Sequence, residues 1–239
     1  MVPLSAYTFN PIGKVHSCFK EKFGIPRQPG LVAEACATVE LLPPYDDGAT
    51  VRGLTDFSHI WLLFVFHANT PGRWRPTVRP PRLGGNQRMG VFASRAAFRP
   101  NPIGQSVVQL DEITHTAGRL ELQVSGVDLL DQTPVLDIKP YLPYADALPL
   151  AKGGYADERP AALRRVTFSD QAKAALAAAD ARQGTNLRNL VKRLLEIDPR
   201  PAYRKDGTRR RTYGMHIEEI NIEWELRGEE IFVTAVSRR

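Results

Sequence analysis

The chain has 239 residues, of which 43% are hydrophobic and 24% are charged, and its formal net charge is +6 at pH 7. This balance supports a hydrophobic core without disulfide or metal staples, so it excludes a largely disordered chain. The longest apolar run, residues 60–66, is too short to span a bilayer, and the N-terminal sequence has neither the basic nor the apolar part of a signal peptide. We therefore expect a cytoplasmic protein that has no contact with a membrane.

Short strands dominate the prediction for the first 146 residues, where apolar or alternating runs are separated by turn residues. The predicted strands are residues 12–17, 32–42, 60–66, 90–92, 106–110, 119–126 and 134–141. The continuous apolar run IWLLFVF at 60–66 is typical of a strand that is buried on both faces. Helical patterns are few here and do not alternate with the strands, so we predict a mainly β fold with a small β-barrel and not a Rossmann sheet.

A change of composition at residues 145–160 predicts a linker and two domains, residues 1–150 and 151–239. In the second, Ser169 is a candidate N-cap for an alanine-rich helix that ends near Arg182. Residues 186–197 carry leucine and valine at the spacing of one amphipathic helix face. The alternating residues 220–226, a turn at 227–228 and a second apolar run predict a hairpin. The second domain is thus predicted to be a small α+β module.

Positive charge is concentrated in two segments. Residues 57–110 contain no aspartate or glutamate, and every cation between Arg73 and Arg99 is an arginine. Residues 200–213 form a second basic cluster around the single acid Asp206. An ordinary solvated loop is the alternative, but soluble surfaces usually mix both signs of charge. The arginines therefore favour an anionic partner, and nucleic acid is the commonest one.

Several common sites are excluded by missing motifs. The sequence lacks GxxxxGK[ST], GxGxxG, GxSxG and HExxH, which disfavours a P-loop, a Rossmann nucleotide site, a hydrolase elbow and a zinc protease. Cys18 and Cys36 form no CxxC pair and are expected to be free thiols. The five histidines are scattered, and His59 with His67 alone would give too few ligands for zinc. We expect no metal site.

Two further segments could supply binding or catalytic residues, and each also has a purely structural explanation. The sequence GIPRQPG at 24–30 holds Arg27 and Gln28 in a loop stiffened by prolines, although an ordinary turn explains it equally well. Residues 127–146 concentrate aspartates, one lysine and two tyrosines, which suit acid–base work or base stacking. A capped strand with a surface Lys–Asp pair accounts for them as well.

Taken together, four segments strongly resemble the TsaA-like (TrmO) family of S-adenosylmethionine-dependent tRNA methyltransferases. They are GIPRQPG, DFSHIWLLFVFH, RPPRLGGNQRMGVFASRAAFRPNPIG and DLLDQTPVLDIKPYLPYAD, and the later DPRPAYRKDGTRRRTYGM resembles the small C-terminal domain of the family. The resemblance implies methyl transfer from S-adenosylmethionine to N6 of N6-threonylcarbamoyladenosine, next to the anticodon of a threonine tRNA. It also implies a β-barrel catalytic domain and a homodimer that holds the cofactor near its interface.

The resemblance also implies the residues of the site. Those for the cofactor are Pro26, Arg27, Gln28, His67, Ala68, Arg95, Gln105, Ser125, Gly126, Val127 and Asp128. Gln105 stands where the family commonly has Leu or Met, and Gln132 stands where it usually has Gly. The candidate catalytic residues are Asp137 and Tyr144, which would accept or orient the proton of the acceptor nitrogen, and Lys139, which would hold the threonine carboxylate or a phosphate.

The remaining arginines are assigned to the anticodon arm of tRNA. These are Arg73, Arg75, Arg79, Arg82, Arg88, Arg209, Arg210 and Arg211. Two rival functions are a non-enzymatic RNA-binding barrel, which would use the same arginines without a cofactor, and an RNA hydrolase. The hydrolase is disfavoured because the sequence shows neither an evident metal cluster nor a nucleophile with its base.

Overall fold

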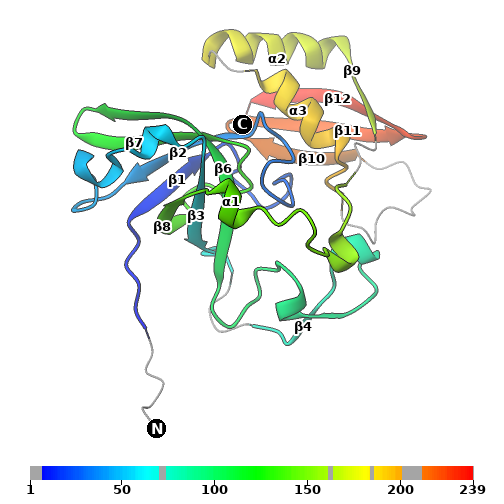
Figure 1. The fold of residues 1–239 in the computed structure, drawn as a ribbon. Coiled ribbons are helices and arrows are strands. Elements are labelled where there is room, and N and C mark those ends of the chain that lie inside the picture. The colour runs from blue at the N-terminus through cyan, green and yellow to red at the C-terminus, as the bar shows by residue number, and fades with distance from the viewer. Residues whose placement is uncertain (1–6, 70–73, 161–163, 184–185, 201–211, 239) are drawn as a thin grey trace.

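The computed structural model describes residues 7–69, 74–160, 164–183, 186–200 and 212–238. It confirms the predicted fold class, because a closed β-barrel is followed by a smaller α+β unit (Figure 1). Among the described residues no helix is long and apolar enough to cross a membrane. Cys18 is a buried free thiol, and Cys36 is an exposed one.

Six antiparallel strands close the barrel in the order β1-β2-β7-β6-β3-β8. These strands are β1 Gly13–Ser17, β2 Cys36–Leu41, β3 His59–Val65, β6 Ile103–Thr116, β7 Arg119–Ser125 and β8 Pro134–Pro140. Side chains alternate between the interior and the exterior along each strand. The interior is therefore filled by residues such as Val39, Leu122 and Val135, which are fully buried.

The prediction that residues 60–66 are buried on both faces was wrong in part. Ile60, Leu62 and Phe64 fill the barrel, whereas the intervening Trp61, Leu63 and Val65 on β3 are only half-buried. The physical reason is closure: a barrel has one dry interior, and its outer face stays partly open to solvent, unlike the helix-covered faces of a doubly wound sheet. The apolar run thus marks a central strand of a barrel.

Two strand boundaries also differ from the prediction. The strand expected at 32–42 begins only at Cys36, because the buried Val32 and Ala35 form a turn instead. The strand expected at 90–92 is replaced by β5, Met89–Gly90, and a 3-10 turn, Val91–Ala93. Strand β5 pairs with β4, Thr77–Val78, as a two-stranded ribbon outside the barrel (Figure 1).

The C-terminal unit is a four-stranded sheet in the order β10-β11-β12-β9, covered on one face by two helices (Figure 1). Its elements are β9 Arg165–Phe168, α2 Asp170–Gln183, α3 Leu187–Glu196, β10 Thr212–Ile217, β11 Ile220–Arg227 and β12 Glu230–Arg238. The predicted cap of α2 is confirmed, because the Ser169 hydroxyl accepts a hydrogen bond from the Ala172 amide at 3.1 Å. The predicted α3 and the β11–β12 hairpin are also present.

Residues 141–164 connect the two units and include α1, Pro143–Asp146. The hydrophobic core continues from the barrel into the second sheet. Polar contacts also join the units: Glu34 of the barrel accepts hydrogen bonds from Asn189 at 2.8 Å and from Arg193 at 3.3 Å. The division into two domains at residue 150 stays a prediction.

Candidate active site

A cavity of about 660 Å³ opens at one end of the barrel. Among the residues that line it are eight of those expected to contact a cofactor, namely Pro26, Arg27, Gln28, His67, Ala68, Arg95, Gln105 and Asp128. They come from five separate segments of the sequence, so the fold brings together what the sequence keeps apart. Ser125, Gly126 and Val127 do not line the cavity.

Strand pairing explains why these segments meet. Strands β3 and β6 are antiparallel, with Val65 opposite Ile103 and Leu63 opposite Gln105, so the end of β3 and the start of β6 share one rim of the barrel. The strand ends before His67, which therefore lies on the loop beyond β3 and not on its face. The GIPRQPG loop reaches the same rim and is tied to the turn after β7, because the Gly30 amide donates to the Gly126 carbonyl at 2.8 Å.

Gly104 allows two aromatic rings to form the wall of the cavity. A Cβ at this position would come within 2.9 Å of Cζ of Phe66 and closer still to the ring of Phe64. The two rings meet edge to face with centroids 5.1 Å apart. Any larger residue at position 104 would have to displace them, so the glycine is required by close packing and not by a positive φ.

The polar side of the cavity combines an arginine, an amide and a carboxylate. Arg95 donates a hydrogen bond to the side-chain oxygen of Gln28 and a longer one, 3.4 Å, to the backbone carbonyl of Gln105. The Ser106 hydroxyl donates to Asp128 at 2.6 Å. Burial raises the pKa of Asp128 to about 6, although the Ser106 hydrogen bond and the positive charge of Arg95 work in the opposite direction.

The cavity also contains residues that the sequence reasoning missed. Lys22 donates from Nζ to the Ala68 carbonyl and to Asn69 Oδ1, both at 2.9 Å, which fixes the loop after β3. Phe98 and Arg99 also line the cavity. Lys22 and Asn69 lie next to motifs that the sequence analysis singled out, so proximity to those motifs is the signal that could have found them.

The candidate catalytic residues lie elsewhere on this chain. Asp137 and Lys139 form an ion pair of 2.8 Å on β8, and Asp137 also accepts the Ile138 amide at 2.9 Å. Lys139 pairs with Trp61, toward the opposite end of β3 from the cavity rim. Tyr144 is 87% exposed on α1. The structure thus brings Asp137 and Lys139 together but does not bring any of the three to the cavity.

The arginines assigned to tRNA separate into three groups. Arg75, Arg79 and Arg88 line a second hollow of about 500 Å³ beside the ribbon of β4 and β5. Arg82 donates instead to the backbone carbonyl of Glu158. Arg73 and Arg209, Arg210 and Arg211 lie outside the described residues. Within the described ranges no group of three or more His, Cys, Asp or Glu is placed to hold a metal ion.

Known proteins match the chain along nearly its whole length. Residues 14–147 match the tRNA-methyltransferase O N-terminal domain, and residues 160–239 match the TrmO C-terminal domain. A tRNA (adenine(37)-N6)-methyltransferase of Escherichia coli (strain K12) is 47% identical over 96% of this chain and 98% of its own length. A Pseudomonas aeruginosa protein, RcsF, named for S-adenosylmethionine-dependent methyltransferase activity, is 50% identical over 91% of this chain and 92% of its own.

The solved structures agree with the sequence relatives. The crystal structure of TrmO from Pseudomonas aeruginosa superimposes with a TM-score of 0.81 at 42% identity, and the match covers 98% of this chain and 99% of that one. The family match extends over both the barrel and the C-terminal unit. This chain belongs to the tRNA-methyltransferase O (TrmO) family.

Proposed function

We propose that this protein is an S-adenosylmethionine-dependent tRNA methyltransferase that methylates N6 of N6-threonylcarbamoyladenosine at position 37, beside the anticodon of threonine tRNA. The observation that carries the proposal is the cavity at the barrel rim, where eight residues expected from the family resemblance converge. The names of the relatives support the same reaction. Acting on tRNA, the protein would work in the cytoplasm.

The residues of the cavity fit this cofactor. A volume of about 660 Å³ lies in the range of small-molecule sites. S-adenosylmethionine carries a carboxylate, a cationic amine and sulfonium, and a flat aromatic adenine ring. The cavity offers a matching set of groups in Arg27 and Arg95, the Asp128 carboxylate and the Phe64–Phe66 wall. When bound, the cofactor supplies an electrophilic methyl group.

The role of the protein is then mainly to position the acceptor base. The exocyclic nitrogen is a weak nucleophile because its lone pair is delocalised into the ring and the carbamoyl group. Methyl transfer needs this nitrogen in line at about 3 to 3.5 Å. Asp137 and Tyr144 are retained as groups that accept or orient its proton, and Lys139 as the group for the threonine carboxylate or a phosphate.

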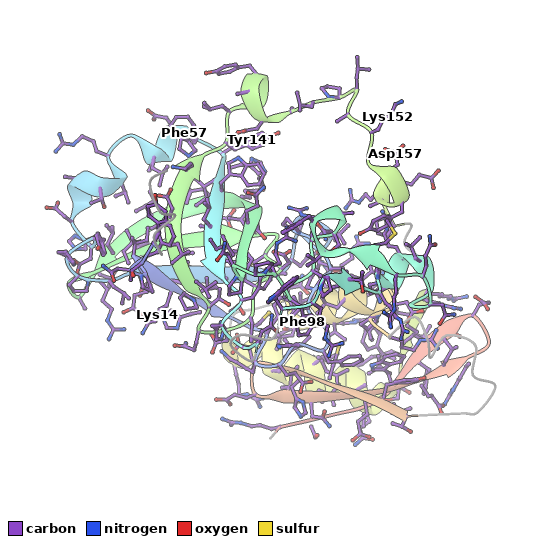
Figure 2. The ribbon with its side chains drawn as sticks, turned by 90° about the horizontal axis from the view of Figure 1, so that it is seen from below. Lys14, Phe57, Phe98, Tyr141, Lys152 and Asp157 are labelled. Carbon is purple, nitrogen blue, oxygen red and sulfur yellow. The ribbon has the colours of Figure 1, made fainter. Side chains whose placement is uncertain are left out.

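Because these three residues lie away from the cavity of their own chain, their proposed roles require a homodimer in which one protomer completes the site of the other. The exposed apolar side chains of α1 and the following segment support such a contact: Leu148 is 72% exposed and Leu150 is 97% exposed. Figure 2 shows the segment from Tyr141 through Lys152 to Asp157 bowing away from the barrel, where a second protomer has access to it.

The dimer is tested by light scattering on the intact protein and on the Leu148→Glu, Leu150→Glu variant. We expect a dimer for the wild type and a monomer with little methylation activity for the variant. Mixing an Arg95→Gln protomer with an Asp137→Asn protomer should restore part of the activity if each site draws on two chains. A monomeric wild type that methylates tRNA would contradict the shared site.

Calorimetric titration with S-adenosylmethionine tests the cofactor directly. We expect saturable one-site binding, weakened at least tenfold by Arg95→Gln because this side chain lines the cavity. Arg119→Gln is the matched control, since Arg119 is an exposed arginine at the β6–β7 turn. A wild-type protein that binds tRNA but releases no heat with the cofactor would instead be an RNA-binding module without this activity.

A further inference from the structure

The second hollow gathers three arginines without a compensating charge. Strands β4 and β5 pair Thr77 with Gly90 and Val78 with Met89, and Arg79 and Arg88 are the residues directly beyond this short ladder. Together with Arg75, two residues before the ribbon, they line one hollow of about 500 Å³. Like charges gathered in one small space repel each other.

Nothing in the described part of the chain neutralises this charge. Arg75, Arg79 and Arg88 are exposed, and none of the ion pairs within the described residues includes them. The sequence from 57 to 110 contains no acid, so no carboxylate from the same segment can approach. Arginine stays charged at every physiological pH. An anion between the guanidinium groups would therefore relieve their repulsion.

The hollow adjoins the cofactor cavity. Phe98, labelled in Figure 2, lines both spaces and is 44% exposed. The guanidinium of Arg75 lies 5.8 Å from the Phe98 ring centroid, and the Arg75 amide donates to the Phe98 carbonyl at 3.3 Å. The hollow and the cavity therefore share the Phe98 side chain as a common wall.

Two further exposed aromatic residues lie close in the sequence to the residues of the hollow. Trp74 precedes Arg75 and is 51% exposed, and Phe92 follows β5 and is 78% exposed. The guanidinium of Arg99 lies 5.8 Å from the Phe92 centroid. Arginines beside accessible rings supply both phosphate contacts and stacking platforms for single-stranded nucleotides.

We propose that the hollow of Arg75, Arg79 and Arg88 is an anion subsite, which holds a carboxylate or phosphate of the RNA substrate next to the methyl-acceptor base. This inference rests on the proposed function for the identity of the RNA. Two groups of that substrate have the required chemistry: the carboxylate of the threonylcarbamoyl group, and a backbone phosphate adjacent to the base. Both would accept paired hydrogen bonds from the guanidinium groups of the hollow.

The test uses the intact protein and an Arg79→Gln, Arg88→Gln double variant. The control is Arg52→Gln, Arg119→Gln, which removes the same charge from exposed turns. Those turns, just before residues 54–56 and between β6 and β7, lie on the opposite side of the molecule from β4 in Figure 1. Dissociation constants are measured between 50 and 200 mM salt for two tRNAs that differ only in whether adenosine 37 carries the threonylcarbamoyl group.

We expect the double variant to bind the modified tRNA at least tenfold more weakly than the control variant does. A carboxylate ligand predicts that this loss disappears with the unmodified tRNA. A phosphate ligand predicts the same loss with both tRNAs and a salt slope reduced by roughly 0.7 to 0.9 per lost contact. The melting temperature should stay constant or rise, because the repulsion among the arginines of the hollow is reduced.

Equal affinity of the double variant and the control for both tRNAs, or a wild-type protein that binds neither, would overturn the subsite. Calorimetry with S-adenosylmethionine on the same variants separates this failure from failure of the proposed function. The subsite predicts unchanged cofactor affinity in the double variant. A wild-type protein that does not bind the cofactor would contradict the methyltransferase assignment. The measured affinities for tRNA would still decide whether the subsite exists.

Discussion

Arg27 of the barrel donates a hydrogen bond from Nη2 to the backbone carbonyl of Arg200, 173 residues later in the chain, at 2.9 Å. Arg27 lines the cofactor cavity. Arg200 is buried and makes a two-point contact with Asp198, from Nε to Oδ1 and from Nη2 to Oδ2, each 2.8 Å long. The C-terminal unit therefore helps to fix an arginine that lines the cavity.

Replacing Asp198 with Asn should weaken both stability and cofactor affinity. The substitution leaves the buried Arg200 cation without its carboxylate, which typically costs about 3 to 5 kcal/mol, and shifts the carbonyl that holds Arg27. Chemical denaturation and calorimetry with S-adenosylmethionine measure the two effects. The control Asp170→Asn removes a fully exposed carboxylate whose partner is Lys173 and should leave both properties at the wild-type level.

The Arg27→Met substitution tests the cavity arginine separately from the Asp198–Arg200 contact. It should reduce cofactor affinity about tenfold while it costs much less stability than Asp198→Asn, because Arg27 is on the exposed side of the contact. Cofactor affinity that stays at the wild-type level in both variants would show that the link between the units does not position the site.

Asp128→Asn should make the protein more stable at neutral pH. Burial raises the pKa of Asp128 in the folded state to about 6, above its ordinary value of 3.8, so the folded protein favours the protonated form. The stabilisation linked to that proton is complete below pH 4 and is lost as the pH rises through 6. At pH 7.5 the variant should gain about 1 to 3 kcal/mol over the wild type, and the gain should vanish below pH 4.

The Asp131→Asn substitution should change the stability at neutral pH in the opposite direction. Partial burial raises the pKa of Asp131, but Lys20 and the Ser17 amide outweigh it, so the net pKa is lowered. The stability from this carboxylate is present above pH 4 and is lost as the pH falls through the folded pKa. Its replacement should therefore destabilise the protein at neutral pH. Denaturation curves that change in the same direction for both variants would contradict the assigned environments.

Gly104→Ala should disturb the aromatic wall of the cavity. The new Cβ would press on the rings of Phe64 and Phe66, and overpacking of this kind costs about 1 to 3 kcal/mol. Relief requires movement of a ring that borders the cavity, so cofactor affinity should fall as well. Gly48→Ala is the matched control, because a Cβ there meets nothing within 4 Å. Equal melting temperatures for the two variants would contradict the packing argument.

The sequence predicted some parts of the site better than others, and the difference is physical. Arg27, Gln28 and Arg95 were expected to lie together because their motifs resemble the family, and they line one cavity. Asp137 and Lys139 looked equally promising, but residues two apart on a strand share a face, and they pair with each other at 2.8 Å. Local spacing fixes such neighbours and says nothing about which end of the barrel they occupy.

The link between Arg27 and Arg200 had no local signal at all. Contacts across 173 residues depend on how the two sheets pack, and a single sequence does not encode that packing in any short pattern. The same holds for Arg75, Arg79 and Arg88. Their charge was evident in the sequence, but their meeting in one hollow depends on how the loops beside β4 and β5 fold. The barrel itself was predictable because strand alternation is a local property.

Gln132→Gly should stabilise the protein slightly. Gln132 has a φ of 61°, a left-handed conformation that glycine adopts without the Cβ penalty. The greater freedom of glycine in the unfolded chain offsets part of the gain, so we expect an increase of up to about 1 kcal/mol, measured by thermal denaturation. The Gln132 side chain lies only 3.3 Å from His16 Nδ1, and a net loss of stability would mean that this contact outweighs the backbone strain.

The central claim is the reaction itself, and mass spectrometry of tRNA nucleosides tests it most directly. The protein is incubated with isotope-labelled S-adenosylmethionine and tRNA that carries N6-threonylcarbamoyladenosine, and the digested nucleosides are then analysed. We predict one labelled methyl group on that nucleoside with the wild type, and at least a tenfold lower yield with Arg95→Gln. Absence of labelled nucleoside under conditions where both the cofactor and the tRNA are bound, or label on a different nucleoside, would contradict the account.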